Sequence, residues 1–192
     1  MARSYRIAVI PGDGIGKEVV PEGLRVLDEA ARRFGFTLDA THYDWSCETF
    51  RQTGKMMPDD GLEQLRPHDS IFLGAVGWPG VPDHVSLWGL LIPMRRGFDQ
   101  YANVRPCRLM PGAKTPLRDR TEKDIDFVVV RENTEGEYSS TGGRMFPGTE
   151  REFASQQSVF TRIGCDRIMD YAFKLAETRP RKKVTSATKS NG

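Results

Sequence analysis

The sequence predicts an α/β fold built around a parallel sheet. Short apolar, β-prone runs alternate with longer segments in which apolar residues recur every three or four positions. A glycine-rich turn joins the first run to the first helical segment. Parallel strands need a crossover connection, usually a helix, so this alternation favours a parallel sheet covered by helices.

The first strand and the first helix have the clearest local patterns. Residues 5–10 (YRIAVI) are apolar and end at a Pro-Gly pair, which indicates a buried strand. A helix is predicted over residues 17–34, where apolar residues share one face and Gly35 provides the stop. The apolar face consists of Val20, Leu24, Leu27, Ala31 and Phe34.

The remaining elements follow from the same two periodicities. Between the first helix and residue 98, the sequence predicts strands over 36–44 and 70–76, a short helix over 58–65, a Gly/Pro-rich loop over 76–84 and a helix over 87–98 that Pro93 interrupts. After that, it predicts strands over 102–109, 125–132, 153–161 and 183–187, and a helix over 165–177. The last strand has barely begun where the sequence stops at Gly192, so we expect a truncated chain.

Composition narrows the class of protein. Of 192 residues, 38% are hydrophobic and 28% charged, as in ordinary soluble globular proteins. A net charge of +2 is too small to indicate a nucleic-acid partner. No signal peptide is visible, and no apolar run approaches the ~18 residues of a membrane helix. The three cysteines are an odd, scattered set, which favours a reducing compartment, so we predict a cytoplasmic location without a membrane partner.

The first motif is the turn at residues 11–17 (PGDGIGK), between a predicted strand and a predicted helix. Such a turn can bring backbone N–H groups close to an anionic ligand, but taken alone a tight structural turn is the better interpretation. It does not match the Rossmann fingerprint, which would need glycine at position 17, or the Walker A loop, because Glu18 follows Gly-Lys.

The second and third motifs supply arginines and a tyrosine. Residues 90–96 (LLIPMRR) and 101–106 (YANVRP) offer guanidinium groups suited to carboxylates, or else a solvated basic face. Residues 128–138 (VVVRENTEGEY) place Arg131 at the end of a predicted strand and Tyr138 seven residues later. Tyrosine can act as a general acid beside positive charge, although a charged turn with a packed tyrosine is an equal alternative.

Two further features call for weaker interpretations. Lys189 follows the last predicted strand and would by itself be read as a surface lysine, because nothing local indicates burial or neighbouring charge. Asp166 and Asp170 share a helix face, as a divalent metal would require. A pair of surface carboxylates is the better interpretation there.

Five motifs, in order, resemble the isocitrate/isopropylmalate dehydrogenase family over residues 6–192. They are PGDGIG, LLIPMRR, ANVRP, VVRENTEGEY and TSATKSNG. Within the family, residues 85–89 (VSLWG), 98–101 (FDQY) and the final pair, Asn191 and Gly192, most resemble the tartrate and D-malate group. The resemblance implies the isopropylmalate dehydrogenase-like α/β fold rather than a Rossmann fold, in agreement with the failed fingerprint.

The resemblance also implies roles for substrate-site residues. Arg95, Arg105 and Arg131 match arginines that hold the substrate carboxylates. Tyr138 matches the tyrosine that protonates the enol after decarboxylation. Lys189 matches a lysine that assists removal of the hydroxyl proton and reaches a neighbouring subunit's site, which implies a homodimer. We expect these five side chains to converge on one pocket.

A second set of residues is implied to lie near the nicotinamide of NAD. They are Ile15, Val76, Gly77, Trp88 and Leu91. The resemblance further implies a manganese or magnesium ion and a monovalent cation such as potassium. The family's metal-ligating aspartates follow the lysine, so we expect the ligands to lie beyond Gly192 and none to be present in this chain.

The implied activity is NAD-dependent oxidation, with decarboxylation, of a small 2-hydroxy diacid such as tartrate or D-malate. Isopropylmalate or isocitrate is the alternative substrate within the family. The resemblance divides the chain into residues 1–100, part of a cofactor-side domain, and residues 101–192, part of a dimerisation and substrate domain. On this basis we expect the chain alone to be inactive, and a non-catalytic dimerising fragment is the alternative from another class.

Overall fold

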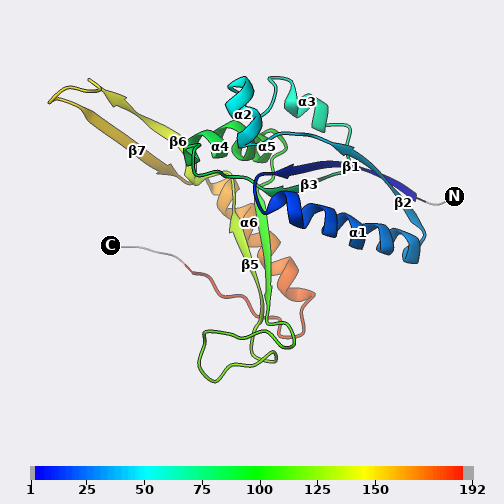
Figure 1. Ribbon diagram of the computed structural model, residues 1–192. Helices are drawn as coiled ribbons and strands as arrows, with labels where there is room; N and C mark the ends of the chain where they lie inside the picture. The colour runs from blue at the N-terminus through cyan, green and yellow to red at the C-terminus, as the bar shows by residue number, and fades with distance from the viewer. Residues whose placement is uncertain (1–2, 188–192) are drawn as a thin grey trace. The chain divides into compact units, whose positions relative to one another are not determined.

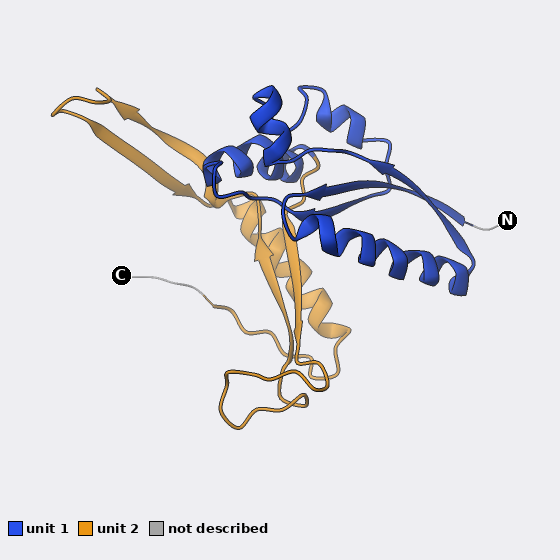
Figure 2. Ribbon diagram, in the orientation of Figure 1, with its two compact units in different colours: residues 1–97 blue, residues 98–192 orange. Residues whose placement is uncertain are grey.

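The computed structural model describes residues 3–187 and separates into two compact units (Figure 1). Residues 1–97 form the first unit and residues 98–192 form the second (Figure 2). Both units combine helices with strands, as the predicted α/β class requires. The cofactor and substrate roles that the family resemblance implies for the two parts stay predictions.

The first unit is built on a three-stranded parallel sheet, which confirms the predicted arrangement. Strand β1 (Arg3–Gly12) lies in the centre, between β2 (Phe36–His42) and β3 (Ser70–Ala75). Both neighbours run parallel to β1, with Ile7 paired to Ala40 on one side and to Ser70 on the other. Because β1 is covered on both faces, its central residues 7–10 are all buried.

Helix α1 (Gly16–Phe34) covers one face of this sheet, at the predicted position (Figure 1). Its Val20 packs with Ile7 and Val9 of β1, and Leu24, Leu38 and Phe72 surround them. The helix ends where Gly35 adopts a left-handed conformation (φ 72°) and its N–H donates to the Ala31 carbonyl. The apolar stripe and the glycine stop therefore act as the sequence predicts.

Several short helices lie on the other side of the sheet (Figure 1). Helix α2 (Cys47–Thr53) was not predicted, although Ser46 accepts a hydrogen bond from the Thr49 N–H at its start and Gly54 ends it. That pairing of a serine N-cap with a terminal glycine is a signal that could have revealed it. Helix α3 (Gly61–Leu65) is shorter than the predicted 58–65.

The predicted interruption near Pro93 takes the form of a π-helical turn. Helix α4 (Asp83–Ser86) leads into η1 (Leu87–Leu91), and α5 (Ile92–Gly97) follows. The Ile92 N–H donates to the Leu87 carbonyl, five residues back. Pro93 then falls in the first turn of α5, where a missing N–H is tolerated.

The second unit departs from the predicted parallel arrangement. Strands β4 (Ala102–Arg108) and β5 (Asp126–Glu132) form at the predicted positions, but they pair antiparallel in a two-stranded sheet. No helix crosses between them, because the connecting segment is an irregular loop. Antiparallel neighbours need no helical crossover, which is why alternation of elements predicts strand direction only where a helix intervenes.

A second antiparallel pair contains one strand that the sequence did not reveal. The predicted strand is β7 (Phe153–Val159), and its partner is β6 (Gly136–Met145). Three glycines and several polar residues hide any alternation in β6, and the pairing is irregular between Gly136 and Thr141. Such a strand is held by its partner rather than by its own propensity.

Helix α6 (Arg162–Glu177) packs on β5 and begins three residues before its predicted start. The prediction of a strand over 183–187 is wrong, since residues 182–187 have no regular structure. A strand is defined by its hydrogen-bonded neighbour, and none of the described strands pairs with this segment. Within residues 3–187, none of the helices has the length and apolar character needed to cross a membrane.

Candidate functional site

In the first unit, the turn between β1 and α1 is organised by a buried carboxylate. Asp13 is only 3% exposed. Its oxygens accept hydrogen bonds from the Cys47 N–H (3.0 and 3.1 Å) and from the Gly77 N–H (3.1 Å). Asp13 thereby ties the turn to the start of α2 and to the loop after β3. The turn could be recognised in the sequence, but the role of Asp13 could not, because its partners lie 34 and 64 residues away.

The glycines of this turn bear on whether it is a tight structural turn or a ligand-binding loop. A Cβ on Gly12 would lie 2.1 Å from the Ala75 carbonyl oxygen, and one on Gly16 would lie 2.1 Å from that of Pro11. These two glycines are therefore needed for close packing against the sheet. Gly14 differs, because it is exposed, has φ +46° and has open space where a Cβ would lie.

A cavity of about 340 Å³ opens beside Gly14. Its lining combines two cations, two carboxylates and an aromatic ring: Asp13, Gly14, Lys17, Glu48, Arg51 and Trp78. Lys17 forms a 2.5 Å ion pair with Glu48, which raises the pKa of the lysine. The cavity therefore presents glycine backbone, charged side chains of both signs and a half-exposed indole to a ligand.

The residues predicted to lie near the nicotinamide all belong to the first unit. Ile15 immediately precedes α1 and is exposed. Val76 and Gly77 follow β3 and adjoin the Asp13 turn. Trp88 and Leu91 lie on η1, where Trp88 stacks under the Arg96 guanidinium at 5.1 Å. Their role in binding NAD stays a prediction.

Cys47 is expected to be the least reactive of the three free thiols. Burial, followed by the neighbouring Asp13, raises its pKa from 9.0 to about 11. A thiol reagent at about pH 8 should therefore modify the exposed Cys107 and leave Cys47 untouched until the chain unfolds. Labelling followed by mass spectrometry of peptides measures this, and rapid modification of Cys47 in the folded chain would contradict it.

The same shift has a consequence for stability. The neutral Cys47 thiol is favoured in the folded state, so its contribution is complete below pH 9.0, where the unfolded thiol is also protonated. That contribution is lost as the pH rises towards about 11. Urea titrations across this range should show a smaller alkaline loss of stability in Cys47→Ala than in the parent chain.

In the second unit, the strand register brings two predicted arginines onto one face. Arg131 of β5 pairs with Asn103 of β4, and Arg105 lies two residues further along the same strand. Residues two apart on a strand share a face, so Arg105 and Arg131 are diagonal neighbours, typically about 7–8 Å apart. Arg105 also donates to the Asn103 side chain at 3.1 Å.

Arg131 and Tyr138 form the most direct contact among the predicted site residues. The Arg131 guanidinium donates a hydrogen bond to the Tyr138 hydroxyl oxygen, and its carbon lies 5.0 Å from the centre of the tyrosine ring. Both side chains are partly buried. Positive charge therefore lies beside the oxygen that becomes negative when a tyrosine gives up its proton.

The segment between this pair is held by its own side chains. Glu132 accepts hydrogen bonds from the Thr134 N–H (2.9 Å), the Thr134 hydroxyl (2.6 Å) and the Glu135 N–H (2.7 Å). Burial acts to raise the pKa of Glu132, but these donors outweigh it and hold the pKa below its usual value. Asn133 is buried and bonds the Gln100 and Tyr101 carbonyls.

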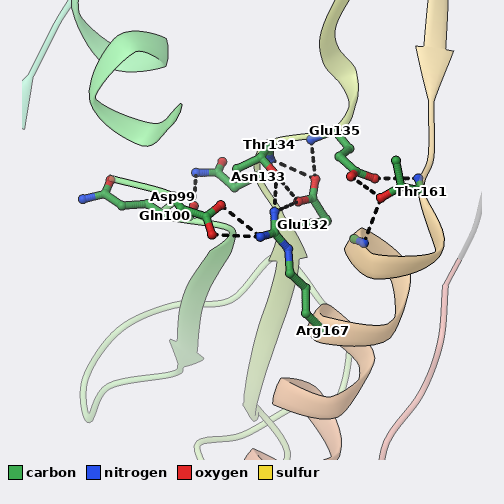
Figure 3. A network of polar contacts seen from close by, with 9 residues as sticks. Asp99, Gln100, Glu132, Asn133, Thr134, Glu135, Thr161 and Arg167 are labelled. Atoms are coloured by element: carbon green, nitrogen blue, oxygen red, sulfur yellow. Dashed lines mark hydrogen bonds and ion pairs between the residues drawn. The ribbon is translucent and has the colours of Figure 1, made fainter. Parts of the chain in front are cut away.

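Arg167 of α6 completes this network (Figure 3). It donates to both carboxylate oxygens of Asp99 (2.9 and 3.0 Å) and to the Thr134 hydroxyl (2.7 Å), and it lies 3.7 Å from Glu132. Arg167 could not be found from the sequence, because its partners lie 33 or more residues away and no local motif connects them.

Two predicted catalytic or substrate-binding residues are not brought into this group. Arg95 lies on α5 in the first unit, so its convergence with Arg105 and Arg131 stays a prediction. Lys189 lies outside the described residues, which end at residue 187, so its proposed role also stays a prediction.

The two aspartates on α6 are surface carboxylates, as the sequence favoured. Asp166 and Asp170 do not pair with each other. Each forms an exposed ion pair on the helix, Asp166 with Arg162 at 2.6 Å and Asp170 with Lys174 at 2.7 Å. These ion pairs confirm the surface interpretation.

Residues 3–187 contain no cluster of three or more histidine, cysteine, aspartate or glutamate side chains that could hold a metal ion. The buried carboxylate of Asp13 and the partly buried one of Glu132 already accept protein hydrogen bonds, Asp13 from backbone N–H groups and Glu132 from Thr134 and Glu135. The described part of the chain does not by itself fit a divalent cation.

The metal ligands are predicted to lie outside the described part of the chain. The family resemblance puts them beyond Gly192, and Gly192 itself lies outside the described residues. The structure therefore gives no geometry for that end of the chain, and the position of the ligands after Gly192 stays a prediction.

Comparison with known proteins places this geometry in context. The profile of the isocitrate/isopropylmalate dehydrogenase family matches residues 6–191. The chain is 63% identical to D-malate dehydrogenase [decarboxylating] of Escherichia coli (strain K12), covering 100% of this chain and 54% of that protein. It is 62% identical to the tartrate dehydrogenase/decarboxylase of Pseudomonas putida, covering 100% and 53%.

Solved structures give the same result at the level of the fold. An isocitrate dehydrogenase from Methylococcus capsulatus superposes with a TM-score of 0.70 at 28% identity, covering 90% of this chain and 48% of that one. The chain therefore spans about half the length of the relatives that it matches.

Proposed function

Because the chain belongs to the isocitrate/isopropylmalate dehydrogenase family, we propose that it forms part of an NAD-dependent enzyme that oxidises and decarboxylates a small 2-hydroxy diacid, tartrate or D-malate. The observation that carries the proposal is the contact between Arg131 and Tyr138, with Arg105 on the same strand face. This arrangement combines sites for carboxylates with a proton donor.

The chemistry assigned to this chain concerns charge and protons. NAD, when bound, supplies the acceptor for the hydride that leaves the hydroxyl-bearing carbon. Arg105 and Arg131 hold the substrate carboxylates by charge-assisted hydrogen bonds. Loss of CO2 from the resulting keto acid gives an enol, to which Tyr138 donates a proton. Lys189 accepts the proton that leaves the hydroxyl as hydride departs, a role based on the sequence motif alone.

The other features of the proposal rest on family resemblance. NAD is preferred over NADP, and the glycine turn with the cavity beside Gly14 suits part of a dinucleotide. Manganese or magnesium is the proposed divalent cation, and a monovalent cation such as potassium is a further candidate. No step is assigned to the divalent cation, because the described residues contain no cluster of histidine, cysteine, aspartate or glutamate side chains that could hold it. A homodimer and a cytoplasmic location complete the proposal, the latter consistent with free thiols.

Two alternatives stay in competition. Isopropylmalate or isocitrate is the alternative substrate, because the family includes both activities. For the 192-residue chain by itself, the alternative is a non-catalytic dimerising fragment. The identities above 60% to D-malate and tartrate enzymes favour the proposed substrates.

An absorbance assay of NADH formation tests the proposal. Protein carrying this sequence at the length of its relatives is assayed with D-malate, tartrate, isopropylmalate and isocitrate, with NAD or NADP, and with manganese or a chelator. We expect turnover with D-malate or tartrate and NAD only when manganese is present, and no turnover from the 192-residue chain. A preference for NADP or isocitrate would contradict the assigned substrate group.

A further inference from the structure

The chain between Arg131 and Tyr138 must return on itself for the two side chains to meet. Glu132 stabilises this return by accepting three hydrogen bonds from Thr134 and Glu135. Gly136, where β6 begins, has φ +64°, a conformation that other residues rarely adopt. The position of the Tyr138 ring relative to Arg131 therefore depends on how Glu132 and Thr134 are held.

One residue outside this segment holds both of them. The Nη2 atom of Arg167 donates to the Thr134 hydroxyl at 2.7 Å and lies 3.7 Å from a Glu132 carboxylate oxygen. The Thr134 hydroxyl in turn donates a hydrogen bond to a Glu132 carboxylate oxygen at 2.6 Å. The hydroxyl is thus a relay that connects α6 to the end of β5, as Figure 3 shows.

The geometry of Arg167 shows that this contact is strongly constrained. Its other terminal nitrogen, Nη1, donates to both carboxylate oxygens of Asp99, a non-glycine residue with φ +45°. Its guanidinium also lies 4.6 Å from the centre of the Tyr101 ring. The Nε atom is buried with no hydrogen-bond partner, an unfavourable arrangement that the contacts of the terminal nitrogens must outweigh.

A second contact joins the same segment to the start of α6. Glu135 accepts hydrogen bonds from the Thr161 N–H (2.8 Å) and the Thr161 hydroxyl (2.5 Å). Thr161 in turn caps α6 by accepting from the Gly164 N–H at 3.0 Å. A Cβ on Gly164 would lie 2.3 Å from the Glu135 carboxylate, so the helix has a glycine where the carboxylate packs.

From these contacts we propose that Arg167, acting through the Thr134 hydroxyl and Glu132, is the positioning residue for the Arg131 and Tyr138 pair. Arg167 itself does not contact Arg131 or Tyr138 in any described hydrogen bond; it sets the fold of the segment that carries them. The inference deepens the proposed function, because the pair it positions is the proposed carboxylate and proton-donating site. Its physical part, the coupling of Arg167 to Tyr138, does not require that function.

The physical part is tested by NMR of the full chain with labelled tyrosine rings. The chain has five tyrosines, and the Tyr138 signal is assigned by its loss in Tyr138→Phe. Thr134→Val removes the relay hydroxyl while keeping the side-chain shape. We expect Thr134→Val and Arg167→Gln to shift the Tyr138 signal. Matched controls are Thr149→Val, in the turn between β6 and β7, and Arg162→Gln, an exposed ion-pair residue of α6.

A Tyr138 signal that stays in place in Thr134→Val would overturn the proposal, even if Arg167→Gln failed to fold. A shift of Tyr101 alone in Arg167→Gln would also overturn it, since Arg167 would then only pack on that ring. Equal shifts of Tyr138 in the control variants would do the same, because the effect would not depend on the network.

The functional part is tested by kinetics of protein at the length of its relatives. Thr134→Val should lower kcat/KM for the diacid by about 100-fold, as expected when reacting groups are displaced by about 1 Å. The loss should appear in kcat as well as in KM, because both Arg131 and Tyr138 move. A shifted Tyr138 signal with unchanged kinetics would leave the positioning intact and contradict the proposed function of the pair.

Discussion

Replacing Arg131 by glutamine should lower kcat/KM for D-malate or tartrate by about 10²- to 10³-fold, which corresponds to about 3–4 kcal/mol. The guanidinium both binds a substrate carboxylate and lies beside the Tyr138 hydroxyl. Glutamine keeps hydrogen-bonding capacity but removes the charge and the planar fork. Steady-state kinetics with protein at the length of its relatives measures the loss.

The controls separate charge from geometry. Arg131→Lys keeps the charge without bidentate geometry, so it should recover only part of the activity. Arg108→Gln alters an arginine of β4 that lies on the opposite face of the same strand pair, and it should leave kcat/KM within about twofold. Equal losses in Arg108→Gln and Arg131→Gln would show that general destabilisation, and not the substrate site, explains the result.

Replacing Tyr138 by phenylalanine should slow the steps after oxidation by about 10²- to 10⁴-fold, the usual contribution of a positioned acid. Formation of NADH should be affected less, because the hydride leaves before the enol needs a proton. The ring that packs under Arg131 is retained, so stability should change by about 1 kcal/mol or less. The observable result is an initial burst of NADH and CO2 without matching release of the keto-acid product, because CO2 leaves before the enol is protonated.

The matched control is Tyr171→Phe, which removes a hydroxyl from a tyrosine of α6 that packs edge-on against Tyr101. It should leave both NADH formation and CO2 release unchanged. If Tyr138→Phe kept the parent enzyme's ratio of keto-acid product to NADH in the burst, another group would have to protonate the enol, and the role carried over from the family resemblance would be wrong.

The first unit shows how far local patterns can determine structure. Strand β1, helix α1 and the stop at Gly35 were predicted because strand and helix periodicities act within about a dozen residues. The parallel direction also followed, since helical segments separate the strands. The five motifs, read in order, gave the family and the positions of Arg131 and Tyr138 before any contact was known.

Local pattern could not determine what depends on distant partners. Hydrogen bonds to another segment determine both the antiparallel pairing of β4 with β5 and the existence of β6. Residues 183–187 form no strand, because no described strand pairs with them. Helix α2 is an intermediate case. Its capping residues could be recognised in the sequence, but it has no apolar pattern that would predict a helix.

The same distinction applies to the candidate site. The sequence by itself determined which residue types stand at the strand ends, because the motifs are contiguous. Only the tertiary structure decided that Asp13 anchors the first turn and that Arg167 holds the segment between Arg131 and Tyr138. Asp13 is a buried carboxylate and Arg167 a partly buried guanidinium, and both form hydrogen bonds to residues more than 30 positions away. Such groups are stable only when the fold supplies their partners, so their role appears only once the chain has folded.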